Sequence, residues 1–284
     1  LRSPAMDEAT VSTSADFTSH APDEGIAIVV LTHNRVHLLQ KCVENVLLRT
    51  SEATREIVIW DNASPDATAE YLHSLDDPRI RFIISEKNIG QNAYASAFGL
   101  TTAPYLIELD DDVVEAPANW DATLLDAFLR LPKVGFLAAD LEDDPNDEAS
   151  RVRHHERPHE YKLIEENGVR LLTGPAGGGC AITSRELNQR VGGFRQDKKQ
   201  VFWLEDHAYI QDIERLGYLP AVLADLRVHH TGGPYYTVST KEKEAYWAAY
   251  RKRRRRRLAI KKLVFRVPFF PRLNGRFGWF VPPA

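Results

Sequence analysis

The sequence has 284 residues, of which 43% are hydrophobic and 10% aromatic, which is enough apolar content for a globular protein with a core. Its formal net charge is only −4, and its two cysteines, Cys42 and Cys180, exclude a disulfide framework and a CxxC zinc site. Because no apolar run reaches about 18 residues and no signal peptide is recognisable, we expect no membrane-spanning helix and a reducing, cytoplasmic location.

The first 24 residues are expected to form a mobile arm, unless they fold against the body of the protein. Residues 7–24 are rich in Ser, Thr, Ala, Asp and Glu and contain few apolar residues. Met6 is the only methionine, so we expect the natural chain to begin there and residues 1–5 to be a cloning remnant.

Four apolar runs of strand length follow, and segments with helical spacing separate them. The strands are expected at 26–31, 56–60, 80–84 and 105–109, and the helices at 36–47, 64–75 and 93–100. Ser64 is expected to cap the second helix, with Pro65 in its first position. Strands that alternate with helices predict an α/β fold with a parallel sheet covered on both faces.

Polar residues gather where these strands end. They are Thr32 and Asn34 after the first strand, Asp61 and Asn62 after the second, and three aspartates after the fourth. Ligands of open α/β sheets bind at the carboxyl ends of the strands, so this edge is the expected site. The sequence has no GxGxxG after the first strand and no GxxxxGK[ST], which excludes a dinucleotide fingerprint and a P-loop.

The three consecutive aspartates are Asp110, Asp111 and Asp112. Their like charges repel each other, and burying them is costly. A hard divalent cation such as Mg²⁺ or Mn²⁺ prefers carboxylate oxygens and would hold such a cluster together. The alternative interpretation is an acidic turn that is exposed to solvent.

The next part of the sequence is less regular. In order, we expect a helix at 120–131, a strand at 134–139, an acidic loop at 140–147, an irregular segment at 151–166, a strand at 180–183 and a helix at 185–190. The irregular segment contains His154, His155 and His159, but no partner spacing supports a metal site there. The glycine density of residues 174–179 indicates a flexible or closely approached backbone.

Near the end of the body, Glu205 and Asp206 begin another predicted helix. Acidic residues in a first helical turn are favoured by the helix dipole, so an ordinary structural role could account for both. An extended segment at 219–230 then ends in two histidines, His229 and His230.

The order and spacing of these motifs resemble those of the inverting GT-A glycosyltransferases of family 2, over roughly residues 25–260. The matching segments are Thr32-His33-Asn34-Arg35, Asp61-Asn62-Ala63-Ser64, Asn88-Ile89-Gly90, the DxD pair Asp110 and Asp112, Gly192-Gly193-Phe194, Glu205-Asp206, Arg215-Leu216-Gly217-Tyr218 and a histidine before Gly232-Gly233. The resemblance implies a GT-A fold, which is a Rossmann-like, mostly parallel sheet with flanking helices. The single catalytic domain would be residues 25–240, with a nucleotide-binding half at 25–115 and an acceptor half at 116–240.

The resemblance also implies roles for single residues. It assigns nucleotide binding to Thr32, Asn34, Arg35, Asp61, Asn88, Gly90, Asp110 and Asp111. It assigns metal binding to Asp112, Asp110 and either His229 or His230, with Mn²⁺ or Mg²⁺ as the cofactor. Catalysis falls to Asp206, with Glu205 as its neighbour, and acceptor binding to Gly178, Gly179 and Trp203.

The chemistry of these residues agrees with such roles. A divalent cation on Asp112 would neutralise the diphosphate of a nucleotide sugar, while Asp111 is expected to face away from the donor and support the structure. Asp61 would accept a hydrogen bond from the imide N–H of uracil or thymine, although guanine also offers N–H donors. Asp206 would take the proton of the attacking acceptor hydroxyl, and one displacement would invert the anomeric centre.

Two other functions compete with transfer. One is a nucleotide-sugar-binding module without catalysis, in which the carboxylates are only structural. The other is a sugar nucleotidylyltransferase, but the glycine-rich phosphate-activating loop of that class is missing after the first strand. The sequence does not decide whether the acceptor is a glycan, a glycolipid or a secondary metabolite.

Residues 241–284 are expected to form a basic amphipathic helical extension. From Arg251 to the end there are 12 Lys and Arg and no acidic residue, so the first 250 residues carry 24 basic and 40 acidic side chains, a net charge of −16. Apolar residues interleaved with the cations favour peripheral contact with an anionic membrane surface, or a helix docked on the acidic body. Nucleic acid is not the expected partner, and the oligomeric state is left open.

Overall fold

The computed structural model describes residues 12–13, 25–143, 161–196, 205–231, 248–249, 251–252, 255–256 and 259. By its contacts the chain divides into two compact units, residues 1–238 and 239–284. Trp203, His154, His155 and His159 lie outside the described residues, so the predictions made for them stay predictions.

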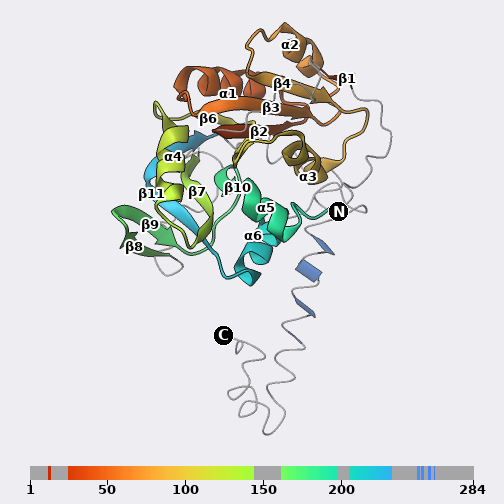
Figure 1. Ribbon diagram of the computed structural model, residues 1–284. Helices are drawn as coiled ribbons and strands as arrows, with labels where there is room; N and C mark the ends of the chain where they lie inside the picture. Colours follow the sequence, from red (N-terminus) through yellow and green to blue (C-terminus); the bar gives the residue numbers. More distant parts are fainter. Residues whose placement is uncertain are drawn as a thin grey trace. The chain divides into compact units, whose positions relative to one another are not determined.

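The first unit is built on one sheet (Figure 1). Its strands are β1 (Ser12–Thr13), β2 (Ile26–Thr32), β3 (Thr54–Asp61), β4 (Ile80–Ile84), β5 (Tyr105–Asp110), β6 (Val113–Glu115), β7 (Val134–Asp143), β8 (Lys162–Glu166), β9 (Val169–Thr173), β10 (Cys180–Ser184) and β11 (Leu219–His230). Its helices are α1 (Val36–Arg49), α2 (Thr68–Ser74), α3 (Ala93–Ala97), α4 (Trp120–Leu129), α5 (Arg185–Val191) and α6 (Glu205–Arg215), with short 3₁₀ turns η1 (Gly90–Asn92) and η2 (Phe98–Leu100).

The strand order is β1-β4-β3-β2-β5-β10-β7-β11-β9-β8, with β6 beside β11. The strands β4, β3, β2 and β5 are parallel to one another, and β7 is parallel to β11. Between these two groups, β10 pairs antiparallel with both β5 and β7. The predicted α/β architecture, with a mostly parallel central sheet and flanking helices, is therefore confirmed, and β10 is the strand that joins its two halves.

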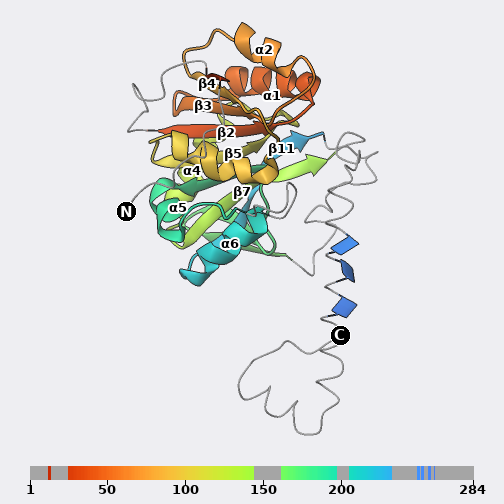
Figure 2. The same ribbon diagram turned by 90° about the vertical axis from the view of Figure 1, so that its right-hand side faces the viewer.

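Helices cover both faces of this sheet. The first core cluster joins one face to the apolar sides of α1, α2 and α4, and the second joins the other face to α3, α5 and α6. In Figures 1 and 2, α1 and α2 lie on one side of β2–β4 and α3 lies on the other. Because both faces are covered, the inner strands are mostly buried, and β2 is buried from Ile26 to Val30.

The N-terminal end of α1 is held by a residue from another loop. The helix has no side-chain cap of its own, and its first N–H, that of Val36, donates to Asp66 Oδ2 at 3.0 Å. Asp66 Oδ1 also accepts from the N–H and the hydroxyl of Thr68, at the start of α2. Asp66 therefore fixes the loops after β2 and β3 against each other.

The prediction that Ser64 caps α2 is wrong. The helix begins at Thr68, and Ser64 Oγ instead accepts from the N–H of Asn34 at 2.8 Å. The φ of Asn34 is 55°, a left-handed conformation that Asn adopts more readily than most residues. The segment Asp61-Asn62-Ala63-Ser64, which we call the DNxS loop, therefore supports the loop after β2 through this hydrogen bond to Asn34.

Two predictions for the second half are also corrected. Residues 140–143, expected to belong to an acidic loop, instead continue β7 to Asp143 beside β11, and residues 144–147 lie outside the described residues. Within the segment expected to be irregular, residues 162–166 form β8, which pairs with β9 as a hairpin. Asn167 and Gly168 make its two-residue turn, both with positive φ, and an Asn-Gly pair is a strong sequence signal for such a hairpin.

At the N-terminus, Ser12 and Thr13 form β1 and pair antiparallel with β4, so this part of the expected arm lies on the sheet edge. In the second unit, Arg251, Lys252, Arg255 and Arg256 are helical and exposed. Among the described residues, no helix is both long and apolar enough to cross a membrane.

Candidate functional site

The carboxyl ends of three parallel strands meet at one edge of the sheet. Thr32 at the end of β2 lies opposite Asp61 at the end of β3, and Leu31 lies opposite Asp110 at the end of β5. β11 reaches the same edge, because His230 pairs with Val113 in β6 and the N–H of Thr231 donates to the carbonyl of Asp112 at 2.8 Å. Residues far apart in sequence therefore converge here.

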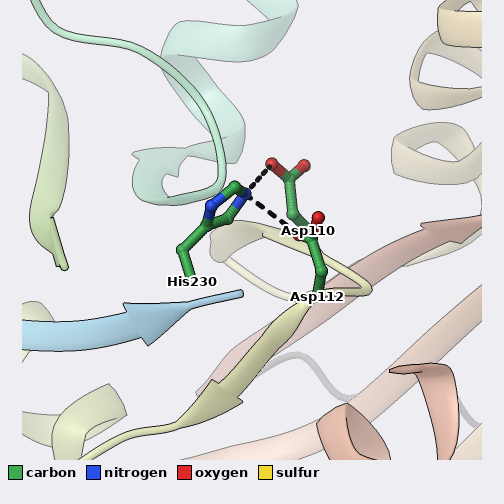
Figure 3. Close-up of side chains that lie close together, drawn as sticks. All are labelled: Asp110, Asp112 and His230. Carbon is green, nitrogen blue, oxygen red and sulfur yellow. Dashed lines mark ion pairs between the residues drawn. The ribbon is translucent and has the colours of Figure 1, made fainter. Parts of the chain in front are cut away.

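Asp110, Asp112 and His230 form one cluster at this edge (Figure 3). His230 Nε2 lies 3.0 Å from Asp112 Oδ1 and 3.5 Å from Asp110 Oδ2, and one ligand atom of each residue lies within 4.8 Å of the others. Two carboxylate oxygens and one imidazole nitrogen suit Mg²⁺ or Mn²⁺, so the residues fit the cation that the sequence implies. His229 alternates with His230 along β11 and is not part of this cluster.

Asp111 is buried and is held by two side chains. It accepts from the Thr32 hydroxyl at 2.7 Å and forms an ion pair with Arg35, whose Nη1 also donates to Asp112 Oδ2 at 3.0 Å. Burial raises the pKa of Asp111 to about 7, against the lowering effect of the Arg35 guanidinium. Thr32 and Arg35 thus contact the aspartates directly, and their predicted contact with the nucleotide stays a prediction.

Asp61 has a different environment. Its side chain is fully buried, its Oδ1 accepts from the N–H of Ser64 at 3.0 Å, and its Oδ2 accepts no hydrogen bond from the described part of the chain. Burial raises the pKa of this carboxyl. A buried acceptor with a spare oxygen is what recognition of an N–H donor requires.

The segment after β4 is tied to the DNxS loop. Asn62 accepts from the N–H of Ile89 at 3.0 Å and donates to the carbonyl of Gly90 at 2.9 Å. Asn88 Oδ1 accepts from the N–H of Gly90 at 2.8 Å, and the φ of Gly90 is 59°. Asn88 and Gly90 therefore shape this loop beside Asp61.

Asp206 is connected to the cluster through two glycines, Gly178 and Gly179, which we call the glycine strap. The N–H of Gly178 donates to Asp206 Oδ2 at 3.0 Å, and the carbonyl of Gly179 accepts from the N–H of Asp110 at 2.9 Å. Asp206 Oδ1 accepts from the N–H of His207 at 2.6 Å. The strap thus places the Asp206 carboxylate two residues of backbone away from Asp110.

Sequence reasoning missed two residues of this region, Tyr94 and Glu108. The buried Tyr94 hydroxyl lies 3.5 Å from Asp110 Oδ1, and its pKa is raised by burial and by the charges of Asp110, Glu108 and Glu205. Glu108 is a buried carboxylate inside β5. A charged residue within the apolar run YLIEL was the available signal for Glu108, whereas nothing in the sequence distinguished Tyr94.

The chain matches the model of one protein family. Residues 27–192, more than half of the sequence, match the family Glycosyl transferase family 2. The chain is also 28% identical, over 93 residues, to the succinoglycan biosynthesis protein ExoO of Rhizobium meliloti (strain 1021). That alignment covers 32% of this chain and 26% of ExoO, so the chain matches about a quarter of that relative's length.

Several solved structures share the fold. GalNAc-T7 with UDP, GalNAc and Mn²⁺ aligns with a TM-score of 0.57 and 17% identity, over 73% of this chain and 44% of its own. The mannosyltransferase PcManGT from Pyrobaculum calidifontis, in complex with GDP-Man and Mn²⁺, aligns with a TM-score of 0.52 and 21% identity. That alignment covers 84% of this chain and 63% of PcManGT. S. aureus TarS 1–349 with UDP-GlcNAc aligns with a TM-score of 0.55 and 12% identity, over 76% of this chain and 61% of its own.

We predict that Asp61→Asn weakens nucleotide binding and stabilises the protein. One charge-assisted hydrogen bond contributes about 1.5–3 kcal/mol, so the affinity for the preferred nucleotide should fall roughly 10- to 100-fold. Because the pKa of Asp61 is raised in the folded state, its ionised form costs stability above that pKa. The gain in melting temperature should therefore be present at neutral pH and disappear as the pH falls through the raised pKa.

Calorimetric titration and thermal unfolding at several pH values would measure both effects. Asp76→Asn, the same change at an exposed carboxylate, is the control and should alter neither quantity. Unchanged nucleotide affinity in Asp61→Asn would contradict the prediction that this residue binds the nucleobase.

Proposed function

Because this chain belongs to glycosyl transferase family 2, we propose that it transfers a sugar from a nucleoside diphosphate sugar to an acceptor hydroxyl with the help of a divalent cation. The observation that carries the proposal is the cluster of Asp110, Asp112 and His230 at the same sheet edge as Asp61. The cluster would hold the diphosphate through the cation, and Asp61 would recognise the nucleobase.

The donor is proposed to be a UDP or dTDP sugar. The spare, buried oxygen of Asp61 supports this, because the imide N–H of uracil or thymine is a single donor that one carboxylate oxygen can accept. The solved structures of similar fold contain UDP, UDP-GlcNAc or GDP-Man, so a GDP sugar remains the competing donor.

The residues of the acid cluster divide the work of holding the donor. Asp110, Asp112 and His230 would bind Mn²⁺ or Mg²⁺, which supplies Lewis-acid neutralisation of the leaving diphosphate. Arg35 keeps Asp112 Oδ2 occupied, so that Oδ1 faces His230. Asp111, bound to Thr32 and Arg35, supports the turn from below and is proposed to make no contact with the cation.

Asp206 is proposed to be the general base. Its two oxygens are oriented by the N–H groups of Gly178 and His207, and a carboxylate that accepts two hydrogen bonds has lone pairs left for a third. Asp206 would take the proton of the acceptor hydroxyl as that oxygen bonds to the anomeric carbon and the bond to the diphosphate breaks. A single displacement of this kind inverts the anomeric centre.

Measuring nucleotide release tests the proposal. With Mn²⁺ and a panel of UDP, dTDP and GDP sugars, we expect turnover with the UDP or dTDP sugars and not with the GDP sugars. A nucleotide-sugar-binding module without catalysis would release no nucleotide and transfer no sugar. A sugar nucleotidylyltransferase would not release a nucleoside diphosphate, whereas a glycosyltransferase does. No turnover with any donor and a panel of hydroxyl acceptors would contradict it.

In the same assay, Asp206→Asn should fold normally and lose at least about 100-fold in rate, which is the low end of general-base contributions. Glu205→Gln is the neighbouring control, because Glu205 is buried and Asp206 is half-buried. Near-normal turnover in Asp206→Asn together with loss in Glu205→Gln would move the role of base to Glu205.

We further propose that residues 251–284 contact an anionic membrane surface on its cytoplasmic face. The exposed, helical Arg251, Lys252, Arg255 and Arg256 support this, since each cation near such a surface contributes about 1 kcal/mol of attraction. We expect the full chain to co-sediment with vesicles that contain acidic lipid and residues 1–250 to stay in solution. Equal behaviour of the two proteins would leave the extension as a helix docked on the acidic body.

A further inference from the structure

Glu108 is an unusual residue for its position. It lies in the middle of β5, two residues before Asp110 and on the same face of the sheet, and only 2% of it is exposed. Its neighbours on that face belong to the core cluster of α3, α5 and α6. Burying a carboxylate among apolar groups is costly, so a side chain of this kind needs a specific role to be an advantage.

The Glu108 carboxylate lies directly against the glycine strap. A Cβ added to Gly178 would lie 2.8 Å from Glu108 Cδ and closer still to Oε1. The φ of Gly178 is outside the left-handed region, so its backbone alone would accept alanine. Gly179 differs, because its φ of 107° itself favours glycine.

The absence of a side chain at residue 178 is therefore explained by Glu108. The sequence assigned Gly178 to acceptor binding, and that role stays a prediction; the close approach that the structure shows is made by Glu108, from inside the protein. The Glu108 carboxylate packs against the strap from the interior of the protein. In the same strap, the N–H of Gly178 donates to Asp206 Oδ2, and the carbonyl of Gly179 accepts from the N–H of Asp110.

We infer that Glu108 is a positioning residue for transfer: its buried carboxylate sets the position of the glycine strap, and through the strap that of Asp206 relative to Asp110. The inference rests on the proposed function, because it concerns the placement of the proposed base. A displacement of about 1 Å between reacting groups can cost about 100-fold in rate, so a contact of this kind matters for the reaction even though Glu108 touches no substrate.

The test exchanges one methylene between the two residues. Gly178→Ala adds a carbon where Glu108 lies, and Glu108→Asp withdraws the carboxylate by one carbon, so the double variant conserves the total volume. Gly99→Ala is the matched control, because a Cβ at that glycine meets nothing within 4 Å. Melting temperature, affinity for UDP with Mn²⁺ and transfer rate are measured for all four variants.

Each single variant should melt at a lower temperature than the wild type, and the double variant should recover most of the loss. Gly178→Ala should lose about 100-fold in transfer rate while its affinity for UDP with Mn²⁺ changes little. The double variant should regain at least about 10-fold of that rate, and Gly99→Ala should match the wild type. If Gly178→Ala does not fold, folding and transfer by the double variant carry the test.

Additive losses in the double variant would overturn the inference, because the two side chains would then not be coupled. Coupled melting temperatures with wild-type transfer in Gly178→Ala would overturn it too, since the contact would then serve stability alone. A wild type that transfers no sugar would contradict the proposed function and remove the positioning role with it. The melting temperatures would still report whether Glu108 and Gly178 are in contact.

Discussion

The mutual repulsion of Asp110, Asp111 and Asp112 is the constraint on which the rest of the site depends. Three adjacent carboxylates at the end of a buried strand are stable only if their charges are compensated. Arg35 and Thr32 hold Asp111, Arg35 and His230 hold Asp112, and His230 and Tyr94 lie beside Asp110. These partners come from the end of β2 and the loop after it, from α3 and from the end of β11, so the contacts that hold the aspartates also fix the position of those elements.

The same edge joins the two halves of the sheet. β10 pairs with β5 on one side and with β7 on the other, and the glycine strap that precedes it connects Asp110 to Asp206. The groups proposed to hold the donor and the group proposed to activate the acceptor are therefore linked through the strap. One link is a backbone–backbone hydrogen bond at Asp110, and the other is a hydrogen bond from the N–H of Gly178 to the Asp206 carboxylate. A short connection of this kind suits a reaction in which two substrates must be aligned.

The sequence predicted the elements whose signal is local. Apolar runs located β2 to β5, and polar residues at their ends located Asp61 and the three aspartates, because parallel strands end at one edge. It did not choose between His229 and His230, since the choice depends on which face of β11 meets the cluster. It misplaced Ser64 and missed the contacts of Asp66 with Val36 and of Glu108 with Gly178. The partners Asn34, Val36 and Gly178 are each 30 or more residues away in the chain. The Asn167-Gly168 turn, in contrast, was a local signal that the prediction did not use.

Calorimetric titration of the preferred nucleotide, with and without Mn²⁺, tests the central claim most directly. If Asp110, Asp112 and His230 hold the cation that binds the diphosphate, the wild type should bind far more tightly with Mn²⁺, and Asp112→Ala and His230→Ala should lose that difference. His229→Ala, a change at the adjacent histidine outside the cluster, should keep it. Unchanged Mn²⁺-dependent affinity in Asp112→Ala would contradict the account.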